Sequence, residues 1–538
     1  MKKQILITIF ILLTKLSFCQ WQWAKQIGGT TATVGFAVLD ANNNIYCAGR
    51  FYTPNCYFDT DTLYANGTND MFLAKYDATG NEQWVKQIGG FNTSLFDGEN
   101  PGPILIDNIN NFFYFTARFY ATVNIDSYSL TSTGGYDILV AKFDFSGNCQ
   151  WLKKIGSVSD DFGAAMAFDS NGDIFCAGHL GSNGLVDTFN VTYGGFLAKF
   201  DPSGNFLWAR NEITGGYPTF IKIINNEILM SGGFDKDTAS IDTTTLISPY
   251  PLWDGFLAKL TINGSCLWAQ RLLGADDCFT RGFETDASNN IYLRGTFSDS
   301  VSIDGTVLHN PGKNDILFCK FDFNGNLVWS QQIFATGSYG ESGGNVSIDN
   351  EGKFYLCGTF SGTATFDTFT VNAPNNNNMF IARYDENGSC LGVRHFGEAQ
   401  GYYSQVDNSG SVLVSGSFVN TVNIGSISLT SHGDLDMFFA KTDAITGIGG
   451  EARASQNQLI IYANPSKGTC NITVPDDFLH EKNLTLSIYD NTGKLIQQKK
   501  LEMNDGKIKL NLEAEAKGVY NVTLSNGKKS YNGKIVFE

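Results

Sequence analysis

Histidine and acidic side chains are the groups in this sequence best suited to catalytic or metal-binding chemistry. The five histidines, His179, His309, His395, His432 and His480, are scattered singly without the His-Glu-x-x-His spacing of a zinc site. No Gly-x-Ser-x-Gly turn stands between a strand and a helix. The 53 acidic residues leave a glycosidase-type carboxylate pair open. We therefore expect a non-enzyme, with a polysaccharide-active hydrolase or lyase as the alternative.

Turns rich in Asp, Asn and Gly resemble the beginning of a calcium-binding loop. Asp169-Ser170-Asn171-Gly172-Asp173 is one such turn, and Asp40 begins another. An EF-hand loop also needs a Glu at its twelfth position and flanking helices, which neither turn has. The turns recur at one register, which favours Asp and Asn shaping hairpins. We expect no cofactor, and a structural Ca²⁺ is the alternative that the pattern leaves open.

Internal repeats decide the fold class. A segment close to apolar-Phe-Leu-Ala-Lys-Phe-Asp recurs at Met71–Asp77, Ile138–Asp144, Gly195–Asp201, Gly255–Leu260, Ile316–Asp322, Met379–Asp385 and Met437–Asp443. Most copies continue through a Gly-containing turn to a Trp, at Trp84, Trp151, Trp208, Trp268 and Trp329. The sixth copy has Gly392 instead. Each repeat of about 60 residues holds four short strands joined by Asp/Asn/Gly turns.

Four-stranded repeats of this kind predict an all-β, seven-bladed β-propeller. The last copy lacks a Trp strand, whereas the first is preceded by a spare one, Trp23–Ile27. If this amino-terminal strand pairs with Met437–Asp443, the last blade is closed by both ends of the domain and no open edge remains. The phrases "DGFLAKLTINGSCLW", "DDFGAAMAFDSNGDIFCAG" and "DASNNIYLRGTFSDS" resemble SBBP-type propeller repeats of exported bacterial proteins. This resemblance implies a fold and carries no particular ligand or reaction.

The amino terminus predicts export. Lys2 and Lys3 precede an apolar run from Ile5 to Leu13, and cleavage between Cys19 and Gln20 would remove residues 1–19 as a signal peptide. A membrane anchor is the alternative, but the run falls short of a bilayer span, and we expect no transmembrane segment. Lipidation of Cys19 is a second alternative. The net charge of −16 argues against a nucleic-acid partner.

The composition changes near the carboxyl end. Residues 455–538 hold 11 Lys and 9 acidic residues, a net charge of +2, which leaves −21 for residues 20–454. We expect a signal peptide at 1–19, a propeller at 20–447, a linker at 448–456 and a small Ig-like β-sandwich at 457–538.

This tail resembles the type A carboxy-terminal sorting domain of the type IX secretion system of Bacteroidetes-type bacteria. The matching segments are Tyr462-Ala463-Asn464-Pro465, Tyr489-Asp490-Asn491-Thr492-Gly493-Lys494, Lys517-Gly518-Val519-Tyr520 and Gly533-Lys534-Ile535-Val536. The resemblance implies passage through the Sec pathway, then handling by the type IX machinery, with surface attachment or release. An ordinary accessory sandwich is the alternative.

The predicted topology also indicates a ligand face. In an antiparallel blade the two tight turns lie on one face of the disc and the two longer connections on the other, where binding loops usually sit. The candidate residues on this second face are Asp97, Glu99, Asp160, Asp161, Asp276, Asp277, Tyr339 and Glu341, with Phe162 and Phe279 nearby. We expect this face to bind a glycan, a protein or a cation, so that the chain is a binding or scaffold protein and a monomer. Alternatively, these acids only solvate or close loops.

Cysteines suggest no metal site, because no Cys-x-x-Cys pair occurs. Export permits disulfides, with Cys47–Cys56 and Cys266–Cys278 as the pairs nearest in sequence, and buried thiols are the alternative.

Overall fold

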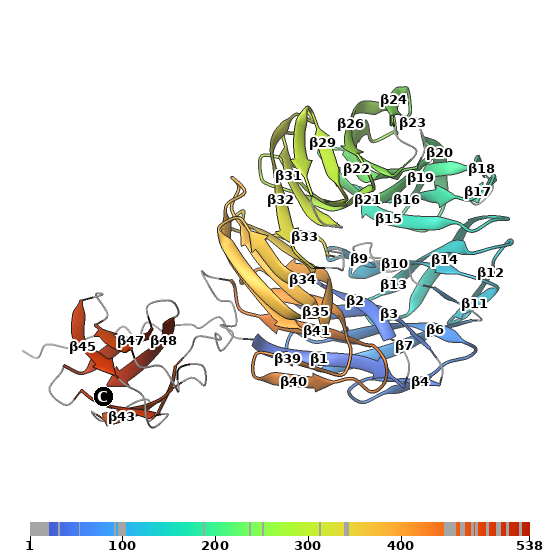
Figure 1. The fold of residues 1–538 in the computed structure, drawn as a ribbon. Coiled ribbons are helices and arrows are strands. Elements are labelled where there is room, and N and C mark those ends of the chain that lie inside the picture. The colour runs from blue at the N-terminus through green and yellow to red at the C-terminus, as the bar shows by residue number, and fades with distance from the viewer. Residues whose placement is uncertain are drawn as a thin grey trace, which may run out of the picture. The chain divides into compact units, whose positions relative to one another are not determined.

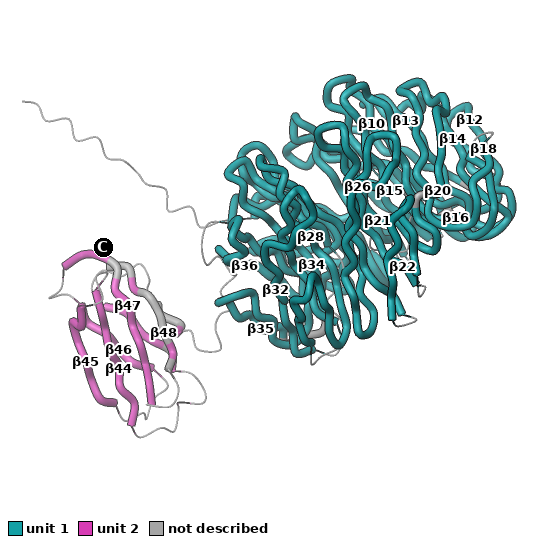
Figure 2. Tube along the Cα trace, turned by 90° about the horizontal axis from the view of Figure 1, so that it is seen from above, with its two compact units in different colours: residues 1–450 teal, residues 451–538 magenta. Residues whose placement is uncertain are grey.

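The computed structural model describes residues 21–537, except for 31–32, 53, 91–92, 95–103, 187–188, 236–237, 250–251, 311–313, 338–343, 446–458, 463–468, 475–477, 479–482, 491–493, 502–506, 513–515 and 527–529. The described residues form strands and no α-helix. Residues 1–450 and 451–538 form two compact units, divided within the stretch expected to be a linker (Figure 2).

Sheets in the first unit are arranged around a common centre, as in a propeller (Figure 1). Seven four-stranded antiparallel units can be traced by strand pairing among the described residues, which is consistent with the expected number of blades. We number these blades in chain order. Their strands, from the centre outward, are as follows.

Blade 1 comprises β2 (Thr33–Leu39), β3 (Ile45–Tyr52), β6 (Asn69–Tyr76) and β7 (Glu82–Gly90), and blade 2 comprises β9 (Ile104–Asp107), β10 (Phe112–Phe119), β13 (Asp137–Asp144) and β14 (Cys149–Ser157), with β8 (Thr93–Ser94) also paired to β10. Blade 3 comprises β15 (Phe162–Phe168), β16 (Ile174–Leu180), β19 (Gly194–Phe200) and β20 (Phe206–Thr214), and blade 4 comprises β21 (Gly216–Ile224), β22 (Glu227–Phe234), β25 (Asp254–Thr261) and β26 (Cys266–Gly274). Blade 5 comprises β27 (Cys278–Thr285), β28 (Ile291–Phe297), β31 (Asp315–Phe321) and β32 (Leu327–Ala335). Blade 6 comprises β33 (Val346–Ile348), β34 (Phe354–Phe366), β35 (Phe369–Tyr384) and β36 (Cys390–Gly397). Blade 7 comprises β37 (Ala399–Val406), β38 (Val412–Phe418), β41 (Asp436–Thr442) and β1 (Trp21–Gly29).

Blade 7 is closed by the amino-terminal strand, as the sequence predicts. Strand β1 pairs antiparallel with β41, in a register that places Trp21 opposite Thr442 and Ile27 opposite Met437. Ile27 and Met437 are fully buried. The all-β propeller fold with closure by both ends is therefore confirmed.

The repeated Trp, which blade 6 replaces with Gly392, joins its blade to the next one. Trp151 of blade 2 donates its indole N–H to the carbonyl oxygen of Pro202, in the turn between the third and fourth strands of blade 3, at 3.3 Å. A Cβ added to Gly204 in that turn would lie 2.8 Å from the Trp151 ring. Gly204 also has a φ of +81°, where glycine is favoured. Trp23 of the closing strand lies against Gly80 of blade 1 in the same way. The Asp-x-x-Gly turn and the Trp thus form one inter-blade contact.

Most blades contain an outer hairpin that was not predicted from the sequence. The stretch between the second and third strands was expected to be a long connection, but short strands pair there: β4 (Asn55–Tyr57) with β5 (Thr62–Tyr64), β11 (Thr122–Ile125) with β12 (Tyr128–Thr131), β17 (Gly184–Val186) with β18 (Phe189–Val191), β23 (Thr238–Ile241) with β24 (Thr244–Ile247), β29 (Ser300–Ile303) with β30 (Thr306–His309), and β39 (Thr421–Ile424) with β40 (Ile427–Thr430). In blade 6 the long strands β34 and β35 supply this hairpin themselves. Several of these hairpins hydrogen-bond to the outer strand of the preceding blade, as β11 does to β7. They extend the blades outward and connect neighbours.

The second unit contains two antiparallel sheets. One is formed by β42 (Ile460–Tyr462), β43 (Thr469–Thr473) and β46 (Lys507–Asn511), and the other by β45 (Leu495–Leu501), β44 (Leu484–Tyr489), β47 (Gly518–Ser525) and β48 (Ser530–Phe537). Ile472 from the first sheet and Ile488, Leu524 and Ile535 from the second belong to one buried cluster.

Candidate functional site

Aspartates in the tight turns accept hydrogen bonds from backbone N–H groups of their own turns. Asp40 Oδ1 accepts hydrogen bonds from the backbone N–H groups of Asn42 and Asn44 at 2.9 and 2.8 Å. Asp169 does the same for Asn171 and Asp173, and its Oδ2 lies 3.1 Å from Lys199 Nζ. Such bonds make the Asp a turn-former. Among the described residues, no group of three or more His, Cys, Asp or Glu side chains is placed to hold a metal ion.

A His–Asp pair in blade 7 resembles the hydrogen-bonded His–Asp pairs of catalytic sites. His432 Nδ1 lies 3.0 Å from Asp436 Oδ2, and the same oxygen accepts the backbone N–H of His432 at 2.9 Å. The backbone bond recurs in blade 2, where Thr133 N–H donates to Asp137 at 2.8 Å, and in blade 1 between Asn66 and Asp70. Burial raises the pKa of Asp436 above its usual range. The pair is thus one version of a turn that the repeat needs.

Four of the predicted face residues fall within the described part of the chain. Asp160 and Asp276 are exposed, Asp277 is half-buried, and Asp161 is fully buried. Asp97, Glu99, Tyr339 and Glu341 lie outside the described residues. Asp160 and Asp161 directly precede β15, and Asp276 and Asp277 directly precede β27, so both pairs lie where inner strands begin.

Asp161 closes its loop. Its carboxylate accepts hydrogen bonds from the Ser157 backbone N–H at 2.6 Å, the Ser157 hydroxyl at 2.7 Å and the Gly181 N–H at 3.0 Å. Burial nevertheless raises its pKa to about 6. The loop therefore holds a carboxyl group that titrates near neutrality.

Stability should depend on the protonation of Asp161. Because its pKa is higher in the folded state, Asp161 contributes stability that is fully present below the unfolded pKa near 4 and is lost as the pH rises through 6. We expect the unfolding free energy of the wild type to gain about 1 kcal/mol, relative to Asp161→Asn, on going from pH 7 to pH 5. Urea denaturation followed by tryptophan fluorescence measures this difference. Asp160→Asn, at the exposed neighbour, controls for the change of charge in this loop. Parallel profiles for the wild type and Asp161→Asn would contradict the expectation.

Aromatic side chains form a continuous arc at the same end of the inner strands. We define the aromatic arc as Tyr120, Tyr136, Phe162, His179, Tyr193, Tyr217, Trp253 and Phe279, with the cations Arg118 and Arg281. The ring centroids of Tyr217 lie 3.8 Å from His179, in a parallel stack, and 4.9 Å from Trp253. Trp253 continues to Phe279 at 5.0 Å. The arc thus runs from blade 3 to blade 5 without interruption.

Blade 2 extends the arc through a stacked guanidinium. The Arg118 guanidinium carbon lies 4.3 Å from the centroid of the Phe162 ring and 4.7 Å from that of Tyr136. Tyr136 in turn lies 5.8 Å from Tyr120. Tyr120 and Phe162 are 41% and 38% exposed, and Tyr193 is 40% exposed, so part of the arc faces solvent. Large aromatic side chains that are held by one another and remain accessible are typical of binding surfaces.

The repeats provide an internal control for this arc. Phe162, Tyr217 and Phe279 occupy one register position of the inner strand, opposite His179, Gly233 and Thr296 of the second strand. At the same position blade 1 has Val34, blade 2 has Ser94 and blade 7 has Gln400. The fold is built equally well with these smaller or polar residues. The aromatic residues of blades 3 to 5 are therefore not required by the propeller itself.

Sequence reasoning found only part of the arc. Phe162 and Phe279 stand beside the predicted acidic loops, but Arg118, His179, Tyr217 and Trp253 lie at the ends of strands that read as core. Aligning the repeats at the end of the second strand would have exposed Arg50, Arg118 and His179 where other repeats have Gly233, Thr296, Thr359 and Ser417. That departure from the repeat was the available signal.

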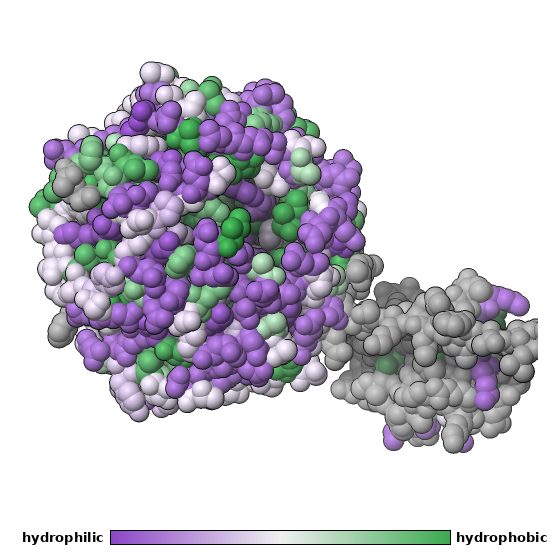
Figure 3. Space-filling view, turned by 180° about the vertical axis from the view of Figure 1, so that it is seen from behind, coloured by the Kyte–Doolittle hydropathy of each residue, from purple (hydrophilic) through white to green (hydrophobic). Residues whose placement is uncertain are grey.

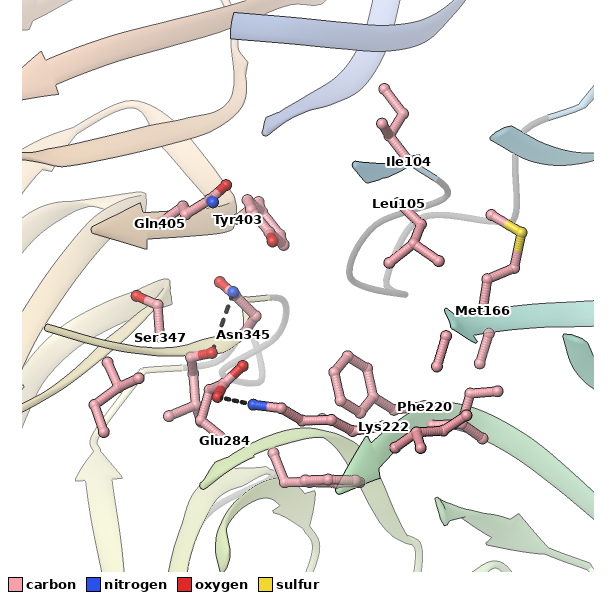
Figure 4. Close-up of a pocket in the computed structure, with 18 of the residues that line it drawn as sticks. Ile104, Leu105, Met166, Phe220, Lys222, Glu284, Asn345, Ser347, Tyr403 and Gln405 are labelled. Carbon is pink, nitrogen blue, oxygen red and sulfur yellow. Dashed lines mark hydrogen bonds and ion pairs between the residues drawn. The ribbon is translucent and has the colours of Figure 1, made fainter. Parts of the chain in front are cut away.

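A cavity of about 450 Å³ lies along the axis, lined by the later parts of the inner strands β9, β15, β21, β27, β33 and β37. The hollow near the centre of the propeller is visible in Figure 3. Figure 4 shows Ile104, Leu105, Met166 and Phe220 on one side and Glu284, Asn345, Ser347, Tyr403 and Gln405 on the other. Two of these side chains accept hydrogen bonds from a neighbouring blade. Asn345 Oδ1 accepts the backbone N–H of Ser404 at 2.7 Å, and Gln405 Oε1 accepts the backbone N–H of Leu39 at 2.7 Å.

Within this cavity the charged lining groups are Lys222 and Glu284, which form an ion pair (Figure 4). Burial and the nearby Glu284 raise the pKa of Tyr403 above its usual range. A glycosidase of the ordinary type needs two carboxylates facing its substrate. Glu284 is the single carboxylate among the described residues that line this cavity.

The cysteines of the described residues are present as thiols. Cys47 and Cys56 are both buried and free, so the first sequence-near pair is not joined. Burial raises the pKa of Cys176 to about 12, which keeps this thiol protonated.

Residues of the predicted sorting motifs are only partly described. Gly518 begins β47 and is exposed, Tyr520 follows in the same strand and is buried, and Lys494 donates its backbone N–H to Asp490 at 3.0 Å. Lys534 lies in β48, opposite Asn521. Asn464, Pro465 and Gly493 lie outside the described residues, as do Cys19 and Gln20. No helix in the described part of the chain has the length and apolar character needed to cross a membrane.

The fold and the tail define a class of protein: a β-propeller carried on a chain with an export domain. Residues 460–538 match the family model of the secretion system C-terminal sorting domain. This match identifies the protein as one that is secreted or displayed at the cell surface.

Two curated proteins are similar to the chain. One is an uncharacterized WD repeat-containing protein, L264, of Acanthamoeba polyphaga mimivirus, 26% identical over 429 residues, covering 63% of this chain and 30% of that protein. The other is the regulatory protein FlaEY of Caulobacter vibrioides, 24% identical over 190 residues, covering 34% and 19%. The chain thus spans less than a third of the length of either relative.

Solved structures also show likeness to the chain. The WD40 domain of Neurospora crassa Pan2 is 11% identical, with a TM-score of 0.38, covering 77% of this chain and 91% of that one. The Dos1 propeller is 10% identical, with a TM-score of 0.36, covering 79% and 96%.

Proposed function

We propose that this protein is an exported binding protein whose propeller presents a ligand site on the face formed by the longer connections of blades 2 to 5. The observation that carries the proposal is the aromatic arc, because its members Phe162, Tyr217 and Phe279 occupy a repeat position that blades 1, 2 and 7 fill with Val34, Ser94 and Gln400. Side chains that a symmetric scaffold does not require are the ones available for binding.

The export route is part of the same proposal. The sorting domain supports delivery to the cell surface or the medium. We propose that residues 1–19 direct Sec export, that the repeats are of the SBBP type, and that the type IX secretion machinery handles the tail in a Bacteroidetes-type bacterium. The propeller is then the part that acts outside the cell, as a monomer and without a cofactor.

Substituting two residues of the arc tests the binding role. The double variant Phe162→Ala/Tyr217→Ala should lose at least about tenfold in affinity for ligands that the full-length wild type binds on a glycan and protein panel, since buried aromatic anchors dominate binding energy. Gln400→Ala changes the same repeat position in blade 7 and is the matched control, expected to bind like the wild type. Thermal unfolding of each variant shows whether the fold is kept. Equal affinities for the double variant and the wild type would contradict the proposal.

A further inference from the structure

Carboxylates border the aromatic arc along its length. Asp160 stands two residues before Phe162 and lies in contact with the preceding blade, accepting the Tyr136 backbone N–H at 2.9 Å. Asp276 and Asp277 stand directly before the strand that carries Phe279. Asp235 follows the end of β22 and acts electrostatically on Tyr217, whose pKa is raised to about 12 by burial first and then by this carboxylate. Each of blades 3, 4 and 5 thus adds negative charge beside its aromatic residues.

Positive charges of the arc are arranged differently. Arg118 is only 5% exposed and lies between the rings of Phe162 and Tyr136. Arg281 is half-buried, with its guanidinium carbon 5.4 Å from the Phe279 centroid. Asp160 and Asp276 are exposed. Among these described charged residues, the exposed ones are therefore carboxylates.

The composition of this surface resembles the centre of a protein interface. Trp, Tyr and Arg are the residue types most enriched among the energetically important positions of such interfaces. Aromatic rings with few rotatable bonds, fixed by mutual contacts, lose little entropy on binding. Exposed apolar side chains continue the surface, with Leu252 38% exposed beside Trp253 and Val158 68% exposed beside Asp160. An arc that spans four blades offers more area than one small ligand would cover.

We propose that the partner of the aromatic arc is a basic protein segment, whose Lys or Arg side chains pair with Asp160, Asp235, Asp276 and Asp277 while its apolar side chains pack on Phe162, Tyr217 and Trp253. This inference rests on the proposed binding function and specifies its ligand. Negative charge favours association with a cationic partner and disfavours an acidic one, and it makes the affinity depend on salt. Acidic polysaccharides are disfavoured for the same reason.

Defined probes can test the charge and the chemistry of the partner. The full-length protein is measured against a set of 15-residue synthetic peptides containing Lys or Arg with Leu or aromatic residues, against copies in which each Lys and Arg is Glu, and against neutral oligosaccharides. We expect binding to members of the basic set only, with a Kd that increases at least about fivefold between 50 and 300 mM NaCl.

Two variants separate the contributions of charge and aromatic surface. Asp160→Asn/Asp276→Asn should weaken basic-peptide binding by about three- to tenfold and reduce its salt dependence, because the amide keeps the shape and removes the charge. Glu386→Gln, which removes an exposed carboxylate paired with Lys353 in a tight turn of blade 6, is the control and should bind as the wild type does.

Each outcome decides one of the two proposals. Binding of basic peptides that is lost in Phe162→Ala/Tyr217→Ala supports both. Salt-independent binding of a neutral oligosaccharide that is lost in that variant, or failure of every basic peptide to bind, overturns the basic-segment inference. Binding of any probe that the Phe162→Ala/Tyr217→Ala variant retains in full overturns the arc as the binding site.

Discussion

A chain without residues 21–30 is expected to lose more than about 5 kcal/mol of unfolding free energy, because removing β1 uncovers the last strand of the ring. Met437, Phe438, Phe439 and Ala440 of β41 are all fully buried beneath or beside β1 in the intact protein. Their exposure, together with a row of unpaired backbone groups, should leave blade 7 without an ordered edge. Tryptophan fluorescence during thermal unfolding follows the propeller specifically, since every Trp precedes residue 330.

A permuted chain provides the matched control for this deletion. Trp21 lies opposite Thr442 in an antiparallel pair, so a short Gly-Ser linker after Ile445 can lead directly into residues 21–29 at the carboxyl end of the propeller. That chain should recover the melting temperature of the wild type. A truncated chain that melts within about 3 °C of the wild type would show that closure contributes little.

The contact between Trp151 and Gly204 should give the second large effect. Gly204→Ala forces a Cβ to within 2.8 Å of the buried indole and places Ala at a φ of +81°. We expect a loss of more than about 3 kcal/mol, and a loss of about 3–5 kcal/mol for Trp151→Ala, which leaves a large cavity between blades. Urea denaturation of the full-length protein, followed by tryptophan fluorescence, gives both values.

Another glycine isolates the contact from the backbone strain. Gly352 has a φ of +75°, but a Cβ there would meet nothing within 4 Å. Gly352→Ala should therefore cost only about 1–2 kcal/mol, the strain of the left-handed conformation. If Gly204→Ala and Gly352→Ala cost the same, the indole does not fix the turn.

The sequence was sufficient to predict the repeat, the all-β class and the closure by Trp23–Ile27, because the alternation of strand and turn is strong and each copy supports the others. The outer hairpins escaped detection for a physical reason. Strands such as β11 and β29 are only four residues long, and the strand that β11 pairs with belongs to the preceding blade. Local pattern alone does not reveal such a partner. The Val-x-Ile-Asp segments before two of the third strands, at Val123–Asp126 and Val301–Asp304, were the visible trace.

The sequence predicted the face on which the candidate site lies better than it predicted the residues that form the site. Counting turns placed Asp160, Asp276, Phe162 and Phe279 on one face, because alternation of connections follows from antiparallel topology. Tyr217 and Trp253 were not singled out, since an aromatic residue at a strand end looks the same in sequence whether it enters the core or borders a surface. Only the ring contacts, of Tyr217 with Trp253 within blade 4 and with Phe162 of blade 3, show that these residues meet.

Closure by the first and last strands also means that the ring can form only after the whole propeller has been synthesised and delivered. Gln22 donates a hydrogen bond to Asp443 across 421 positions of the chain, so β1, which also pairs with β4, lacks its longer partner β41 until nearly the whole propeller is present. A chain that ends before β41, or one still being threaded outward, keeps that strand available to proteases and to other edges. If export begins at the amino end, as proposed above, the ring stays open until the final blade arrives, just ahead of the sorting domain. For that reason, the propeller closes at the same stage at which the carboxyl-terminal sorting domain arrives.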